Sequence, residues 1–180
     1  MMTISSVGED LAKSIKETFK MEMDLKPLLQ SDWIQGYCDE NDEKVLIYEY
    51  LSKGSLDRYL NDTSLTWMKR LNICIDVARA LDFLHRGVGK QAKVIHRDIK
   101  TENILLNNDW KAKLADFGLS LICSINQETD YIMDHACGTR GYVDPLYRQS
   151  GFLTIESDIY SFGVFYLRFC AGDQHLKSKT

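Results

Sequence analysis

VIHRDIKTENILLNNDWKAKLADFGLS, residues 94–120, is the stretch of sequence that decides the fold. Two short apolar runs, residues 104–106 and 111–114, flank a turn at residues 107–109, and this pattern predicts a β-hairpin. A charged loop precedes the first run, and the acidic residue Asp116 follows the second. Because a hairpin brings its two ends together, we expect the charged loop and Asp116 to lie side by side.

Four polar groups would meet at that end of the hairpin: the carboxylates of Asp98 and Asp116, the amide of Asn103 and the ammonium of Lys100. Phosphoryl transfer needs such groups, because the protein mainly positions the reactants and stabilises charge. A carboxylate and an amide oxygen suit a hard Mg²⁺ ion. A second carboxylate can accept the proton of an attacking hydroxyl, and a lysine can neutralise charge on the transferred phosphoryl group.

The motif HRDxKxxN followed by DFG resembles the catalytic loop and DFG segment of eukaryotic protein kinases. The resemblance implies an α+β, two-lobed protein-kinase-like fold, with ATP and Mg²⁺ as cofactors and a protein as substrate. It implies that Asp98 is the catalytic base and Lys100 contacts phosphate, while Asn103 and Asp116 hold the metal and the nucleotide. A lysine two residues after the aspartate resembles serine/threonine kinases rather than tyrosine kinases.

The same resemblance implies roles for neighbours of the motif. Arg97 would contact a phosphate in the activation segment, or else be a solvated surface arginine. Thr139 would bond to the catalytic aspartate and lysine. Asp158 would be buried and would accept backbone hydrogen bonds from the catalytic loop. Phe117 and Gly118 complete the DFG segment, and we expect Phe117 to pack in the core.

The N-terminal third resembles part of a kinase small lobe. Leu11, Ile15, Phe19 and Met23 recur every four residues and predict an amphipathic helix at the position of helix αC. Glu22 would then pair with an ATP-binding lysine, or else be a solvated surface glutamate.

Residues 33–38 and 44–50 predict two strands, the second running into the hinge between the lobes. Tyr48 would be the gatekeeper residue, and the backbone of Glu49 and Leu51 would face adenine. Farther along the chain, residues 52–60 predict a turn and a short helix, and residues 66–85 a long core helix. The polar residues 119–134 would form the activation segment.

A closer resemblance is to plant receptor-like kinases, and it covers about residues 17–167. The stretch CGTRGYVDPLYRQSGFLTIESDIYSFGV, residues 137–164, carries much of it. The implied domains are a partial small lobe at residues 1–50, a partial, mainly helical large lobe at 51–170 and a divergent tail at 171–180. In that family the kinase domain lies on the cytoplasmic side of the plasma membrane.

The composition is that of one soluble globular domain, with 44% hydrophobic and 27% charged residues. A net charge of -4 gives no basic face for nucleic acid. The five cysteines include no CxxC pair, so no zinc site is predicted. The most apolar run, residues 159–170, is shorter than the roughly 20 residues that cross a bilayer. We therefore expect no membrane span and a soluble cytoplasmic chain.

The sequence holds no GxGxxG loop and no VAIK-like strand, which kinases use to bind ATP phosphates. Three hypotheses remain open. The chain is an ATP-dependent serine/threonine kinase domain, or a truncated pseudokinase that docks to an intact kinase as a binding module, or an inactive gene fragment.

Overall fold

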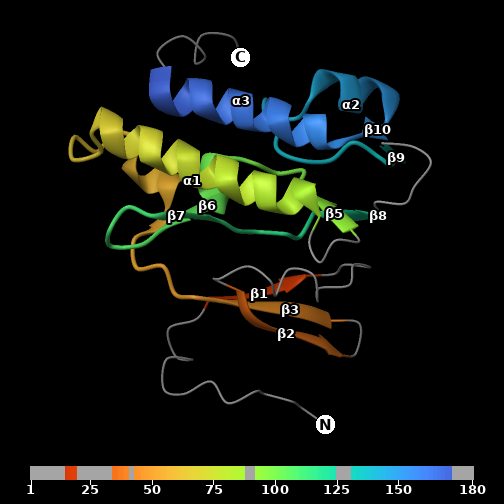
Figure 1. The fold of residues 1–180 in the computed structure, drawn as a ribbon, viewed down its shortest axis with the longest axis horizontal. Coiled ribbons are helices and arrows are strands. Elements are labelled where there is room, and N and C mark those ends of the chain that lie inside the picture. Colours follow the sequence, from red (N-terminus) through yellow and green to blue (C-terminus); the bar gives the residue numbers. More distant parts are fainter. Residues whose placement is uncertain (1–14, 20–33, 41–42, 88–91, 125–130, 172–180) are drawn as a thin grey trace. The chain divides into compact units, whose positions relative to one another are not determined.

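The computed structural model describes residues 15–19, 34–40, 43–87, 92–124 and 131–171. These residues form helices and antiparallel strands (Figure 1), so the fold is a mixed one. The chain divides into two compact units, Met1–Tyr50 and Leu51–Thr180.

The first unit contains a three-stranded antiparallel sheet in the order β1-β3-β2. The strands are β1 (Ile15–Phe19), β2 (Ile34–Glu40) and β3 (Glu43–Tyr48). Two of them confirm the strands predicted at residues 33–38 and 44–50, although residue 33 lies outside the described part. Leu46 and Tyr48 are fully buried, as expected for residues two apart on one face of a strand.

The helix predicted from Leu11 to Met23 is wrong where the structure describes it, because Ile15–Phe19 is strand β1. Residues four apart share one face of a helix, but they also share one face of a strand. The spacing of Ile15 and Phe19 therefore fits both structures, and antiparallel pairing along β3 selects the strand. The other residues of the predicted helix, Glu22 among them, lie outside the described residues.

Helix α1 (Trp67–Arg86) is the longest element of the second unit and confirms the helix predicted at residues 66–85. Thr66 caps its start by accepting a hydrogen bond from the backbone N–H of Lys69. Trp67, at the start of the helix, is 55% exposed. Burial instead follows positions on the side that packs on the hairpin and on α3: Ile73, Cys74, Val77, Leu81 and Leu84.

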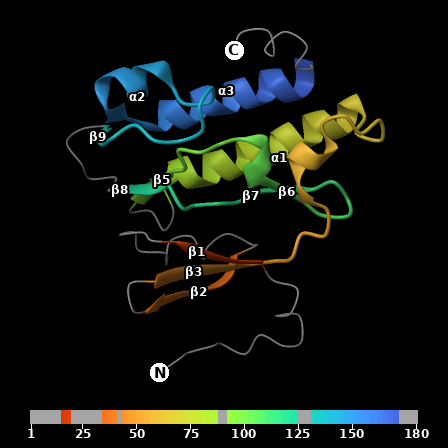
Figure 2. The ribbon, with the colours of Figure 1, turned by 180° about the vertical axis from the view of Figure 1, so that it is seen from behind.

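Helix α3 (Ile155–Ala171) lies beside α1, as Figures 1 and 2 both show. The rings of Phe165 and Phe169 are buried and stacked, with centroids 5.4 Å apart. Arg70 on α1 donates a hydrogen bond of 2.8 Å to the carbonyl of Phe169, and its guanidinium lies over that residue's ring. Aromatic packing and one half-buried arginine therefore join the two helices.

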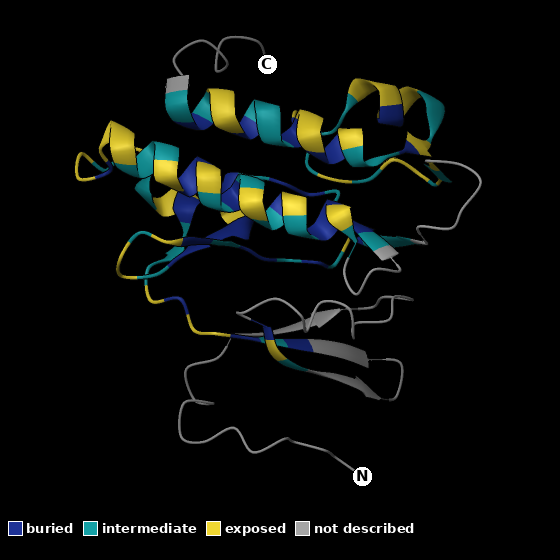
Figure 3. Cartoon of the chain, viewed as in Figure 1, coloured by how far each residue is buried: buried dark blue, intermediate teal, exposed yellow. Residues whose placement is uncertain are grey.

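The predicted hairpin is present as β6 (Ile104–Leu106) and β7 (Ala112–Leu114), within an antiparallel sheet of order β4-β6-β7. The side-chain oxygen of Asn107 accepts hydrogen bonds from the backbone N–H groups of Asp109 and Lys111, which closes the turn. All of β6 is buried, and its partner strand β7 packs against α1 (Figure 3). The hairpin ends thus lie on a rigid support.

The rest of the second unit surrounds the hairpin and α3. Strand β5 pairs with β8, and β9 pairs with β10, both antiparallel. Ile95, Tyr147 and Leu153 form a buried cluster among these elements. The remaining bounds are β4 (Gly54–Ser55), η3 (Leu56–Tyr59), β5 (Ala92–Ile95), η4 (Thr101–Asn103), β8 (Leu121–Ser124), β9 (Ile132–Met133), α2 (Pro145–Ser150) and β10 (Phe152–Leu153).

None of the helices in the described part of the chain is both long and apolar enough to cross a membrane.

The stacked pair on α3 should dominate the stability of the second unit. We expect Phe165→Ala to lower the free energy of unfolding by about 3–5 kcal/mol, because a fully buried ring leaves a cavity. Leu167→Ala on the same helix is the control, since that side chain is 60% exposed and should change little. Urea denaturation of the three proteins measures the difference, and equal losses would contradict the packing described.

Candidate active site

A buried carboxylate fixes the loop between β5 and η4 in place. Asp158, on α3, is fully buried. Its two oxygens accept hydrogen bonds of 2.8 Å from the backbone N–H groups of His96 and Arg97. The ring of His85, on α1, lies 2.9 Å from the same carboxylate. Asp158 therefore links the loop to both helices.

The side chain of His96 is buried between the loop and the residues that follow β7. Its Nε2 lies 3.0 Å from the carbonyl of Ala115, and its Nδ1 accepts from the backbone N–H of Asp98. One donating and one accepting nitrogen describe a neutral imidazole. Burial lowers the pKa of His96, more than the nearby charge of Asp158 raises it, which agrees with the neutral form. The Phe117 ring packs edge-on against it and is buried too.

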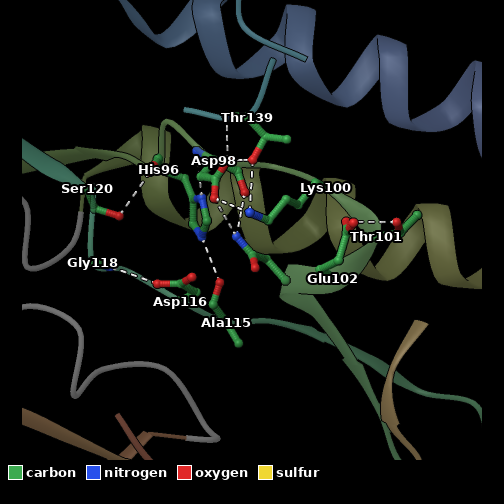
Figure 4. Close-up of polar contacts among 11 residues, drawn as sticks. His96, Asp98, Lys100, Thr101, Glu102, Ala115, Asp116, Gly118, Ser120 and Thr139 are labelled. Carbon is green, nitrogen blue, oxygen red and sulfur yellow. Dashed lines mark hydrogen bonds and ion pairs between the residues drawn. The ribbon is translucent and has the colours of Figure 1, made fainter. Parts of the chain in front are cut away.

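Asp98, Lys100 and Thr139 point toward one another in Figure 4. One oxygen of Asp98 accepts hydrogen bonds from the hydroxyl of Thr139 at 2.6 Å and from its backbone N–H at 2.9 Å. The other oxygen pairs with the ammonium of Lys100 at 2.7 Å. The same ammonium donates to the hydroxyl of Thr139 at 2.9 Å. A carboxylate and an ammonium thus hold one alcohol between them.

The charges of Asp98 and Lys100 stabilise each other. Burial alone would raise the pKa of Asp98, but hydrogen bonds from Lys100 and Thr139, with the positive charge of Lys100, bring it below the usual value. Burial would lower the pKa of Lys100, and the bond and charge of Asp98 raise it above the usual value instead. Both groups are therefore ionised at neutral pH.

Asn103 ties the loop to the hairpin. Its side-chain N–H₂ group donates to the backbone carbonyl of Asp98 at 2.8 Å and to the carboxylate of Asp98 at 3.0 Å. Its backbone carbonyl accepts from the N–H of Ala115 at 2.8 Å. Because both side-chain bonds use the nitrogen, the amide oxygen is left to serve as an acceptor or a metal ligand.

Asp116 follows β7 and lies at the same end of the hairpin as the loop (Figure 4). Its backbone is left-handed, with φ 61°, and one carboxylate oxygen accepts from the N–H of Gly118. The negative charge of Asp116 helps to raise the pKa of Lys100. The hairpin therefore brings Asp116 near the charge of Lys100.

Arg97 is not a solvated surface residue, because its side chain is only 6% exposed. Its guanidinium pairs with the carboxylate of Asp134 at 2.8 Å. It also donates to the carbonyl of His135 at 2.9 Å and to the hydroxyl of Tyr147 at 2.7 Å. Arg97 thus fastens the chain around residue 134 to the loop.

Three further residues were proposed for the site: Glu22, Glu49 and Leu51. Glu49 is exposed near the end of the first unit, and Leu51 is buried at the start of the second. Glu22 lies outside the described residues. In the described part of the chain, no group of three or more histidine, cysteine or acidic side chains could hold a metal ion.

Sequence reasoning missed three contributors: His85, Asp134 and Tyr147. His85, near the end of α1, contacts Asp158. Asp134 and Tyr147 are the partners of Arg97. No spacing rule finds such pairs, since each joins residues far apart in the chain. For Asp134 and Tyr147 the sequence signal was limited to residue type, an acidic side chain and a tyrosine.

Removing the charge of Asp158 should destabilise the whole second unit. In Asp158→Asn an amide nitrogen would face at least one of the three hydrogen-bond donors around this buried group, so we expect a loss of about 3 kcal/mol. Asp109→Asn, in the exposed turn of the hairpin, is the control and should lose less than about 0.5 kcal/mol. Chemical denaturation checks both, and similar losses would remove Asp158 from this role.

The lowered pKa of Asp98 predicts an acid-dependent contribution to stability. Its stabilisation is complete above the unfolded-state pKa, about 3.9, and is lost as the pH falls through the lower folded-state pKa. Unfolding free energies measured from about pH 5 to pH 2 should therefore fall less steeply in Asp98→Asn than in wild type. Thr139→Ala should give an intermediate slope, because it removes the hydroxyl donor. Three identical slopes would exclude the effect.

Comparisons with known proteins agree with this geometry. The family model for the protein kinase domain matches residues 6–180. A probable receptor-like protein kinase of Arabidopsis thaliana is 50% identical over 137 residues, which are 74% of this chain and 16% of that protein.

Two more relatives come from the same plant. A probable LRR receptor-like serine/threonine-protein kinase is 41% identical over 92% of this chain and 19% of its own length. Receptor-like protein kinase HERK 1 is 48% identical over 72% of this chain and 16% of its own length. The chain thus spans less than a fifth of the length of these relatives. It belongs to the protein kinase family and is homologous to plant receptor-like kinases.

Proposed function

We propose that the chain is the part of a receptor-like serine/threonine kinase that transfers the γ-phosphate of ATP to a protein hydroxyl. One observation carries the proposal: Asp98 and Lys100 hold the hydroxyl of Thr139 between them. A substrate serine or threonine would present the same group. Thr139 thus supports the idea that these two side chains can orient an alcohol for transfer.

Asp98 would act as the catalytic base. Its carboxylate is ionised and already accepts an O–H hydrogen bond, so it can orient an attacking hydroxyl and take its proton. Lys100 stays protonated beside it and would neutralise charge on the transferred phosphoryl group. Asn103 would keep Asp98 in position through its two hydrogen bonds.

The oxygens of Asn103 and Asp116 fit a magnesium ion. The amide oxygen of Asn103 points away from the two bonds that its nitrogen makes, and Asp116 supplies a half-buried carboxylate. Hard oxygen ligands of this kind suit Mg²⁺, which would neutralise charge on nucleotide phosphates when bound.

The nucleotide and the cellular setting belong to the same proposal. Units Met1–Tyr50 and Leu51–Thr180 would correspond to parts of the small and large lobes. The backbone of Glu49 and Leu51 would face adenine, and Glu22 would pair with an ATP-binding lysine. The homology to receptor-like kinases supports a kinase domain on the cytoplasmic side of the plasma membrane, acting on protein substrates.

Loss of the base should abolish transfer while leaving nucleotide binding intact. We expect Asp98→Asn to reduce transfer of labelled phosphate from Mg-ATP to a serine- and threonine-containing protein by about 10²–10⁴-fold. Asp109→Asn in the hairpin turn is the control and should keep the wild-type rate. Wild-type rates in Asp98→Asn would remove this residue from the role of base.

Loss of the metal ligand should abolish binding that depends on magnesium. We expect Mg-ATP at about 100 times its Kd to stabilise the wild-type chain by about 2.7 kcal/mol, and Asp116→Ala to remove that increase. The measurement is unfolding free energy with and without Mg-ATP. An unchanged increase in the variant would contradict the metal assignment. A folded wild-type chain without any increase would instead favour a pseudokinase that acts as a binding module.

A further inference from the structure

We propose that Asp134 gives Arg97 a permanent anionic partner, so that residues 131–139, here called the docked segment, stay attached to the catalytic loop without phosphorylation. The inference deepens the proposed kinase function, on which its regulatory meaning rests. It concerns what holds the docked segment in place and does not depend on transfer of phosphate.

The guanidinium of Arg97 is almost completely removed from water, with 6% of the side chain exposed. A buried cation without a partner is strongly destabilising, so this position requires a negative charge. Asp134 supplies it through an ion pair of 2.8 Å. Within the described residues, Asp134 is the acidic side chain that pairs with the Arg97 guanidinium.

Neutral acceptors complete the site. The carbonyl of His135 and the hydroxyl of Tyr147 both accept from Arg97, and that hydroxyl in turn donates to the same carbonyl at 2.8 Å. Tyr147 is buried, with its ring near the guanidinium. Burial raises the pKa of the Tyr147 hydroxyl, so Tyr147 stays neutral and adds no charge. Asp134 is thus the charged partner in a polar site that is otherwise neutral.

The ion pair is continuous with the contacts around the catalytic aspartate. Beyond His135, the chain passes close over the backbone of Arg97 at Gly138, where an added Cβ would lie 2.5 Å from the Arg97 carbonyl oxygen. The next residue is Thr139, which donates to Asp98 through its hydroxyl and backbone. Arg97 and Asp98 are neighbours, so the docked segment contacts two adjacent loop residues. The ion pair between Arg97 and Asp134 therefore also helps to keep Thr139 bonded to Asp98.

A phosphate on a loop commonly orders it by giving an arginine a new anionic partner. Here a carboxylate encoded in the sequence already occupies that role. The docked segment would consequently stay attached to the catalytic loop whenever the chain is folded. Phosphorylation elsewhere in the segment would then add little to its order.

The test is hydrogen–deuterium exchange of backbone amides in the full 180-residue chain, treated with a phosphatase and shown by mass to carry no phosphate. The N–H groups of Asp134 and Thr139 report on docking, because they bond to Gly151 and Asp98. We expect both to be protected in this unphosphorylated wild type. In Asp134→Asn they should exchange at least about tenfold faster, while the amides of α1 stay unchanged.

Three further variants calibrate the result. Asp134→Glu retains the charge and should restore part of the protection. Asp82→Asn removes one carboxylate from an exposed ion pair with Arg86 and should have no effect on the docked segment. Gly138→Ala should undock the segment by steric clash and so show the exchange rate of the undocked state.

Two outcomes would overturn the proposal: wild-type protection in Asp134→Asn, or an unprotected docked segment in the phosphatase-treated wild type. If the amides of α1 also exchange faster in Asp134→Asn, that variant has lost more than the docked segment, and the phosphatase-treated wild type decides alone. Protected amides of Asp134 and Thr139 in that wild type support the proposal, and unprotected ones refute it. The exchange requires neither ATP nor phosphate transfer. A chain that fails to transfer phosphate but shows the expected exchange would refute the proposed function and retain this inference.

Discussion

The buried carboxylate of Asp158 is the constraint on which the candidate active site depends. It takes up two consecutive backbone N–H groups of the loop and a ring nitrogen of His85, so one side chain fixes the loop against α1 and α3. A buried charge is tolerated only where such donors surround it. Because Asp98 directly follows the two residues it holds, the position of the candidate base derives from this contact.

Around Asp158, the side chains of the candidate site come from elements that are individually short. The hairpin contributes Asn103 and Asp116 at its two ends, and the loop contributes Asp98 and Lys100. Backbone and side-chain bonds join them, including the bond between Ala115 and Asn103 across the base of the hairpin. Burial of β6 and the packing of β7 against α1 support this assembly. Precision in the site therefore comes from cross-links between elements more than from their length.

The sequence predicted the parts of the fold whose patterns are local. The hairpin at residues 104–114 has a turn residue, Asn107, whose side chain accepts hydrogen bonds from later backbone N–H groups of the turn, and α1 has a capping threonine, so both could be located in advance. The segment Ile15–Phe19 was mistaken for a helix because a four-residue spacing fits a strand equally well. The pairs formed by His85 and Arg97 were missed because long-range partners leave no periodic trace. The motif suggested roles for Asp98 and Asp116, and the family resemblance also predicted the bonds that Thr139 makes with Asp98 and Lys100.

Two residues of the candidate site, Arg97 and Asp116, have left-handed backbone conformations, with φ of 72° and 61°. Residues with a Cβ adopt this conformation at a cost on the order of 1–2 kcal/mol. Glycine would relieve it, but glycine has neither a guanidinium nor a carboxylate. Selection for a more stable chain and selection for a working site therefore act in opposite directions at these two positions. Substitutions that make this domain more heat-resistant should accumulate elsewhere. A glycine at position 116 would mark a relative without the proposed metal ligand, and a glycine at position 97 would mark one without the ion pair to Asp134.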